Sequence, residues 1–236
     1  MRQLSDQVLQ KRVFSQKSYD LHTANFMLGQ TKEFLSKEKN TIDIGGAAGI
    51  YSTWFCKHSK HVYSFEAVPE VHKQLKKLES QFDNITTYNL ALSNFNGKSV
   101  FFVDDKRLSN SSFQNLVGGI PIEVEACTID SMDIDNVGFI KVDTEGTELD
   151  VLQGAQETID KFNPTCMVEI YHKFNKYPPS TSFEFFFSRG YRCFYNIRPN
   201  EGLREIQSVE HGVEISAGDG MVAIHDGDFL FTKEDV

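Results

Sequence analysis

Short apolar runs alternate with amphipathic segments along most of this chain of 236 residues. An apolar run of about four to eight residues between turn residues is typical of a buried strand, and apolar positions three or four apart are typical of a helix. Helices are expected to begin near Ile50, Pro69 and Leu149 and to include 183–187. The runs predict strands over 41–44, 61–65, 85–89, 100–103, 122–127, 138–143, 165–170 and 191–197, the last paired antiparallel with 221–224 and its continuation 229–231.

This alternation predicts an α/β fold, with a Rossmann-like, mostly parallel sheet and helices on both faces. We expect a helical cap over 1–40 and a single globular domain over 41–236. Ligands of such sheets bind at the carboxyl ends of the strands. Polar or small residues follow five of the expected strands, so this edge is expected to hold the functional site. These residues are Asp43 and Gly45, Glu66, 89–91, 143–146, and Glu169 with His172.

The stretch 41–52, TIDIGGAAGIYS, is the most informative part of the chain. An expected strand runs into Gly45, Gly46 and Gly49 and then into a segment suited to begin a helix. Glycine lets backbone N–H groups approach a ligand because it has no Cβ, and a helix N-terminus favours a carboxylate or phosphate. Glu66 ends the next apolar run, seventeen residues after Gly49. An acid about 20 residues after such a turn suits the hydroxyls of a ribose.

The spacing of the glycines distinguishes between cofactors. The dinucleotide fingerprint needs glycine at three spaced positions, and Ala47 and Ile50 occupy the second and third of them. Asp43 begins the Asp-x-Gly-x-x-x-Gly pattern that remains, and it can brace the turn or meet an ammonium group. An ammonium and a carboxylate at one end, with a ribose at the other, describe S-adenosylmethionine better than a pyrophosphate. A turn that only packs a helix on a strand is the alternative.

Composition narrows the class of partners. A formal charge of −9 argues against a nucleic-acid surface, which needs a basic face. The four cysteines are far apart and form no C-x-x-C pair, as expected of free thiols in a reducing compartment. No apolar run approaches the roughly 18 residues needed to cross a membrane, and the amino end lacks the apolar core of a secretion signal. We therefore expect a cytoplasmic protein with no nucleic-acid or membrane partner, of undetermined oligomeric state.

Seven segments resemble the FkbM-type family of class I S-adenosylmethionine-dependent methyltransferases, in the family's order and spacing, over about residues 40–175. The segments are DIGGAAGIYS (43–52), YSFEAVPE (63–70), NLALSN (89–94), NSSF (110–113), VEACTIDS (124–131), FIKVDTEGTELDVLQGA (139–155) and MVEIYH (167–172). The resemblance implies a class I methyltransferase domain over 41–236, a seven-stranded sheet with its last strand antiparallel, and S-adenosyl-L-methionine as cofactor. It also implies O-methylation, typically of a hydroxyl of a sugar, glycan or glycosylated metabolite.

Two positions depart from the family's pattern. Ala47 stands where the family usually has Asn, so one side-chain contact to the cofactor is in doubt. Ala67 stands where the family usually has Pro after the acid of the second strand. Neither change removes a group on which the chemistry depends. Residues 1–40 and those beyond about 175 do not match closely, so the choice of substrate is not carried over.

The candidate site residues divide by role. The predicted cofactor-binding residues are Asp43, Gly45, Gly46, Gly49, Ser52, Glu66, Ala67, Ala91 and Asp143. The predicted catalytic residues are Asp143, Glu145 and His172, with Glu169 as a further candidate for the general base, since a positioned base must take the proton of an alcohol acceptor. The predicted substrate-binding residues are Ser111, Ser112, Glu145, Glu169 and His172.

Each prediction has an alternative. Asp143 can instead cap the helix that begins near Thr147, and Ser111 and Ser112 can form a plain turn. Glu148 is expected to stabilise the start of that helix through its dipole. The three carboxylates Asp143, Glu145 and Glu169 suit a magnesium ion, although we favour chemistry without a metal.

Three other functions compete with O-methylation. A methyltransferase-like binding module without turnover is favoured by Ala47 and opposed by the intact segment 143–146, DTEG. A nicotinamide oxidoreductase is disfavoured by the glycine spacing. Methylation of a nucleobase amino group usually needs an Asn/Asp-Pro-Pro-aromatic segment at the fourth strand, which this chain lacks there.

Overall fold

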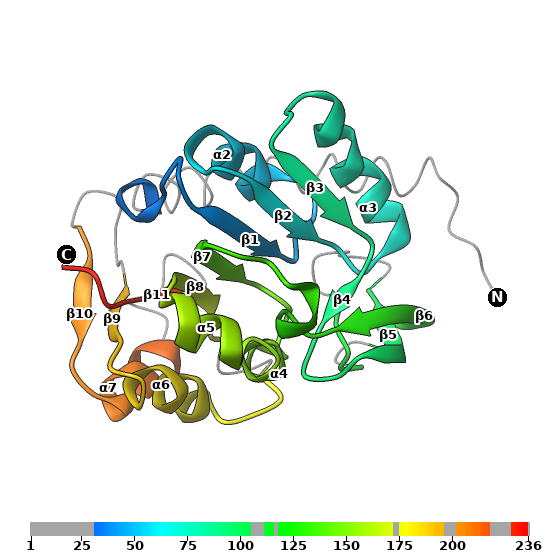
Figure 1. Ribbon diagram of the computed structural model, residues 1–236. Coiled ribbons are helices and arrows are strands. Elements are labelled where there is room, and N and C mark those ends of the chain that lie inside the picture. Colours follow the sequence, from blue (N-terminus) through cyan, green and yellow to red (C-terminus); the bar gives the residue numbers. More distant parts are fainter. Residues whose placement is uncertain are drawn as a thin grey trace.

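A computed structural model describes residues 31–104, 111–115, 118–171, 175–195, 202–217 and 228–235. Its main sheet has the strand order β10-β9-β11-β8-β7-β1-β2-β3 (Figure 1). The strands are β1 (Asn40–Ile44), β2 (Val62–Phe65), β3 (Ile85–Tyr88), β7 (Val137–Val142), β8 (Thr165–Glu169), β9 (Arg192–Tyr195), β10 (Arg204–Ile206) and β11 (Asp228–Thr232). β3, β2, β1, β7 and β8 are parallel, and β11 lies antiparallel between β8 and β9.

The mostly parallel sheet and the antiparallel last strand confirm the predicted fold class. The sheet has eight strands where seven were expected. The additional strand is β10, which pairs antiparallel with β9 at the edge of the sheet. β10 has three residues, two of them charged, so no apolar run marks it in the sequence. The expected run 221–224 and most of the expected cap over 1–40 lie outside the described residues and stay predictions.

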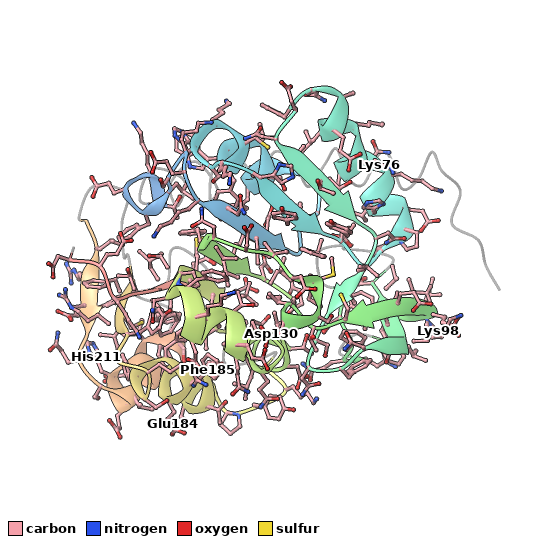
Figure 2. All side chains as sticks on the ribbon, in the orientation of Figure 1. Lys76, Lys98, Asp130, Glu184, Phe185 and His211 are labelled. Atoms are coloured by element: carbon pink, nitrogen blue, oxygen red, sulfur yellow. The ribbon has the colours of Figure 1, made fainter. Side chains whose placement is uncertain are left out.

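Two of the predicted strands belong to a separate small sheet with the order β4-β6-β5. Its strands are β4 (Ala91–Leu92), β5 (Gly97–Val103) and β6 (Ile120–Cys127). β5 and β6 pair antiparallel, while β4 runs parallel to β6. Lys98 of β5 projects from this sheet, at the far right of the molecule in Figure 2, and its ammonium lies 2.7 Å from Glu123 Oε1.

Helices cover both faces of the main sheet, on opposite sides in Figure 1. They are α2 (Ile50–His58), α3 (Pro69–Leu75), α4 (Glu148–Gln153), α5 (Gln156–Phe162), α6 (Pro179–Phe187) and α7 (Val209–Ala217), with the short 3-10 helices η1 (Lys32–Phe34), η2 (Lys76–Ser80) and η4 (Asp130–Met132). In the described part of the chain, no helix is long and apolar enough to cross a membrane.

Successive residues of the central strands enter two different hydrophobic cores. Phe139 of β7 packs with Phe55 of α2, whereas the next residue, Ile140, joins the core that contains Phe183 and Phe186 of α6. A strand buried on both faces reads as a continuous apolar run, which is why β7 and β8 were predictable. Because helices cover both faces of the sheet, a ligand is expected to bind at the ends of the strands.

Candidate functional site

The register of the sheet aligns the ends of four neighbouring strands. Ile44 of β1 lies beside Phe65 of β2 and beside Val142 of β7. Val142 in turn lies beside Val168 of β8. The next residue on each strand therefore lies at the same edge of the sheet. These four residues are Gly45, Glu66, Asp143 and Glu169.

The glycine turn is held by its own backbone. The N–H groups of Gly45 and Gly46 donate to the carbonyl of Phe65 at 3.1 and 2.9 Å, and the N–H of Gly49 donates to the carbonyl of Gly46 at 2.8 Å. A Cβ at Gly45, where φ is +73°, would stand 2.0 Å from the carbonyl oxygen of Asp143. Glycine at this position therefore has a second reason, because it permits close packing of the turn on the end of β7. Cofactor contact by these glycines stays a prediction.

Glu66 lies directly against this turn. Its Oε2 accepts the N–H of Ala47 at 3.1 Å and its Oε1 accepts the N–H of Val68 at 2.8 Å. Burial raises the pKa of Glu66 to about 7, although both backbone hydrogen bonds oppose the rise. The side-chain amide of Asn89 donates to the carbonyls of Glu66 and Ala67 at 2.8 and 3.0 Å, which fixes the carboxylate at the end of β2.

These contacts fit the nucleoside end of S-adenosylmethionine. An ionised carboxylate offers about four lone-pair sites, and backbone N–H groups use one on each oxygen of Glu66. The buried carboxylate therefore keeps lone pairs that can accept further hydrogen bonds. Two ribose hydroxyls would supply such donors.

Asp43 is fully buried behind the turn. It accepts a hydrogen bond from Ser52 Oγ, and Ser52 Oγ lies 2.9 Å from Ser64 Oγ. Burial raises the pKa of Asp43, and the nearby charge of Lys141 opposes the rise. Of the two roles expected for Asp43, these contacts favour bracing the turn, because its partners lie inside the protein.

Lys141 is a buried charged residue of this site that was not predicted from the sequence. Its side chain is 2% exposed, one residue before the end of β7, and its Nζ lies 2.9 Å from Asp143 Oδ2 and 4.0 Å from Asp43 Oδ1. Burial lowers the pKa of Lys141, but the two carboxylates outweigh it and the pKa is raised. A charged residue in an otherwise apolar buried run was the available signal, since lysine is almost never fully buried unless paired.

Three carboxylates converge beside Lys141. One oxygen each of Asp143, Glu145 and Glu169 lies within 4.8 Å of the others, and all three side chains are half-buried. Burial and the charges of Asp143 and Glu145 raise the pKa of Glu169 well above its ordinary value. The predicted general-base candidates that the structure describes therefore do share one site. Their oxygens could also hold a divalent cation.

Tyr51 of α2 borders the same acidic group. Burial, followed by the charges of Asp228 and Asp143, raises the pKa of its phenol. Asp228 begins β11 and lies opposite Glu169 of β8. The acidic site, which is the group of carboxylates at Asp143, Glu145 and Glu169, is thus formed by the loop after β7 and by β8, and it is bordered by β11 and α2.

Glu148 organises the loop that carries two of the carboxylates. Its Oε1 accepts the N–H and the hydroxyl of Thr144, both at 3.0 Å, and the N–H of Gly146 at 2.9 Å. Glu145 between them adopts φ +54°, a left-handed conformation that costs energy in a non-glycine residue. Glu148 is the first residue of α4, as its expected interaction with the helix dipole requires, and its carboxylate also holds this loop. The alternative that Asp143 caps α4 is wrong, since its carboxylate pairs with Lys141.

The predicted substrate residues Ser111 and Ser112 lie beside β5, where the backbone of Ser112 forms an antiparallel β-bridge with Phe102 instead of a plain turn. Ser111 Oγ accepts the N–H of Asp104 at 3.2 Å, and Ser112, fully buried, accepts the N–H of Gln114 at 3.3 Å. Both side chains are buried, and their contact with a substrate stays a prediction. Gln114, which was not predicted, contacts the loop that carries Asp143 and Glu145. Its side-chain amide donates to the carbonyl of Gly146 at 3.0 Å.

The remaining predicted residues are placed as follows. Ser52 is fully buried against Asp43. Ala67 is half-buried beside Glu66. Ala91 is buried in β4, within the core of the small sheet. His172 lies outside the described residues. The cofactor roles of the first three stay predictions.

A family model described as the methyltransferase FkbM domain matches residues 43–193. The match covers more than half of the chain, and the chain therefore belongs to this family of class I methyltransferases, which use S-adenosyl-L-methionine as cofactor. The predicted family, enzyme class and cofactor are confirmed. A search of curated proteins finds no significant match.

Three solved structures show what this chain is similar to, and only the first supports the architecture. Methyltransferase FkbM from Methylobacillus flagellatus KT is 16% identical, with a TM-score of 0.54 over 83% of this chain and 44% of that one. This chain thus spans less than half of that protein's length. Precorrin 8W decarboxylase from Methanobacterium thermoautotrophicum is 11% identical, with a TM-score of 0.48 over 90% of each chain. An rRNA methylase from Streptococcus thermophilus is 11% identical, with a TM-score of 0.44 over 87% and 91%.

Proposed function

We propose that this protein transfers a methyl group from S-adenosylmethionine to a hydroxyl of a sugar, glycan or glycosylated metabolite. The observation that carries the proposal is the convergence of Asp143, Glu145 and Glu169 within 4.8 Å, at the strand ends next to the glycine turn. Carboxylates accept hydrogen bonds from hydroxyls and can take up their protons. An acidic site also disfavours phosphorylated acceptors and nucleic acid, because like charges repel.

Different residues of the chain would bind the methyl donor and the hydroxyl that receives the methyl group. Bound S-adenosylmethionine supplies an electrophilic methyl group on sulfur. Glu66 holds the ribose hydroxyls, and the turn at 45–49 lies between Glu66 and the acidic site. Aligning the acceptor with the methyl group is worth up to roughly 7–11 kcal/mol. A positioned carboxylate that accepts the hydroxyl proton adds about 10²–10⁴-fold.

The test is formation of S-adenosylhomocysteine from S-adenosylmethionine with a panel of acceptors. The panel holds neutral oligosaccharides, a sugar phosphate, a glycosylated small molecule and a short RNA. We expect turnover with a neutral, hydroxyl-bearing acceptor and none with RNA. Turnover with RNA alone would overturn the proposed acceptor class. Cofactor binding without turnover on any acceptor would favour the inactive binding module.

Asp143→Asn tests whether the acidic site performs the reaction. We expect this variant to bind S-adenosylhomocysteine as the wild type does and to lose turnover. Glu184→Gln is the matched control, because it removes one carboxylate from the exposed face of α6, at the bottom of Figure 2. The control should keep full turnover. Unchanged turnover in Asp143→Asn would place the proton acceptor elsewhere.

We further propose that the protein acts in the cytoplasm and needs no membrane or nucleic-acid partner. The net charge of −9 and the acidic site disfavour a nucleic-acid partner, and free cysteines are as expected in a reducing compartment. Fractionation of cells that express the protein, with the acceptor extracted from the same fraction, tests it.

A further inference from the structure

A lysine side chain in the core of a sheet requires a reason. All six residues of β7 are buried, and Lys141 is 2% exposed there. Removing an ammonium group from water is costly unless the group is paired and hydrogen-bonded. The pairing of Lys141 therefore indicates why the chain keeps a charge at this position.

The ammonium group joins two neighbouring strands at their carboxyl ends. It lies 2.9 Å from Asp143 Oδ2, beyond the end of its own strand, and 3.5 Å from the carbonyl of Ile44 on β1. It also lies 4.8 Å from the ring centroid of Tyr51, where a cation and an aromatic face attract each other. Lys141 thus connects the strand that enters the glycine turn with the loop that carries the carboxylates.

The contact with Asp143 is the shortest of these ionic contacts. Asp43, the other carboxylate, is 4.0 Å away and already accepts a hydrogen bond from Ser52. Within the described ranges, Lys141 is the one side chain that donates a hydrogen bond to the Asp143 carboxylate. The backbone of Asp143 is held from the same side, since Gly45 packs against its carbonyl oxygen.

We propose that Lys141 is a positioning residue, which holds the Asp143 carboxylate in the orientation that methyl transfer needs. This inference rests on the proposed function, in which Asp143 lies near the reacting methyl group. A charge-balancing role without positioning is the competing explanation. The two explanations predict opposite effects on the binding of a positively charged sulfur.

Two ligands that differ in that charge separate the explanations without an acceptor. S-adenosylmethionine carries a sulfonium, whereas the sulfur of S-adenosylhomocysteine is neutral. The ratio of their dissociation constants, measured by calorimetry, reports how well Asp143 faces the sulfur. If Lys141 positions Asp143, Lys141→Met should lower the preference for the sulfonium about tenfold, because the attraction between the carboxylate and the sulfonium weakens as their separation grows. If Lys141 only balances charge, removing its positive charge should raise that preference.

A double-mutant comparison tests whether Lys141 acts through Asp143. In the Asp143→Asn background, Lys141→Met should no longer lower the preference for the sulfonium. Lys141→Arg, which keeps a charged donor, should retain the preference to within about threefold, because a guanidinium also pairs with carboxylates. Lys98→Met removes an exposed lysine of the small sheet (Figure 2) and should leave the preference unchanged.

Several results would overturn the inference. They are an unchanged or raised preference in Lys141→Met, or a further lowering by that substitution in the Asp143→Asn background. If Lys141→Met alone does not fold, the double variant removes both partners of the ion pair and is compared with Asp143→Asn in its place. Wild-type protein that binds neither ligand would contradict the proposed function. Wild-type binding with no effect of Lys141→Met would contradict this inference alone.

Discussion

The environment of Glu66 predicts that cofactor affinity depends on pH. Glu66 is 9% exposed, and burial raises its pKa to about 7. In our proposal the ionised carboxylate accepts both ribose hydroxyls. Protonation of Glu66 removes lone pairs that would accept the ribose hydroxyls, so the cofactor binds the ionised form. At a pH where Glu66 is protonated in the free protein, binding therefore releases that proton.

The size of the effect follows from the pKa. At pH 8 most of the Glu66 population is ionised, and at pH 5, two units below its pKa of about 7, about 1% is ionised. The dissociation constant of S-adenosylhomocysteine should therefore rise up to about 100-fold from pH 8 to pH 5, or about 2.7 kcal/mol. Calorimetry at pH 5, 6, 7 and 8, in two buffers with different ionisation enthalpies, measures both the affinity and the proton released.

Glu66→Gln is the matched control, because its amide resembles the protonated acid and cannot ionise. Its affinity should stay nearly constant between pH 5 and 8 and lie near that of the wild type at pH 5. Constant wild-type affinity across this range would refute the reasoning. The same slope in Glu66→Gln would assign the pH dependence to another group.

The same shift affects the stability of the free protein. The folded pKa of about 7 exceeds the ordinary value of 4.5, so between these values the folded state binds more protons than the unfolded state. The contribution of Glu66 to stability is thus fully present below pH 4.5 and lost as the pH rises through about 7. It amounts to about 3 kcal/mol. Because the cofactor is expected to bind more tightly at pH 8 than at pH 5, it should also raise the melting temperature more at pH 8.

Three further predictions concern the turn and the acidic site. Gly45→Ala should lower the free energy of unfolding by more than about 1 kcal/mol and abolish cofactor binding, since the added Cβ would stand 2.0 Å from the Asp143 carbonyl oxygen. Chemical denaturation measures this loss, and a variant as stable as the wild type would contradict it. Ala47→Gly should raise stability by about 0.5–1 kcal/mol, because Ala47 adopts φ +44° and glycine relieves the strain; an unchanged denaturation midpoint would argue against strain. Dialysis against EDTA should leave turnover unchanged, because Lys141 already pairs with Asp143; activity restored by Mg²⁺ would show that the carboxylates are metal ligands.

The sequence was sufficient for the features that depend on local pattern. Apolar runs located the strands of the parallel sheet, and the strand-end rule brought Glu66, Asp143 and Glu169 to one edge. The structure places these three residues at the same end of the sheet, because the parallel strands that precede them are in register. The glycine positions were also predictable, although the second reason for glycine at Gly45 was not, since it depends on how closely β7 approaches the turn.

Contacts between residues distant in the chain could not be predicted from one sequence. Lys141 meets the carbonyl of Ile44, 97 residues away, and apolar periodicity does not report the partner of a buried charge. The reach of Gln114 to Gly146 depends in the same way on how two loops meet. Short β10 has no apolar run, and the strands β5 and β6 could not be assigned to a separate sheet because periodicity identifies a strand but not its neighbours.

The central claim is that the turn between β1 and α2 and the carboxylate after β2 hold an adenosyl cofactor beside the acidic site. A crystal structure with S-adenosylhomocysteine tests it most directly. We expect the ribose hydroxyls to lie on Glu66 and the sulfur to face Asp143. A ligand bound away from Glu66, or a turn filled by the protein's own side chains at saturating ligand, would contradict it.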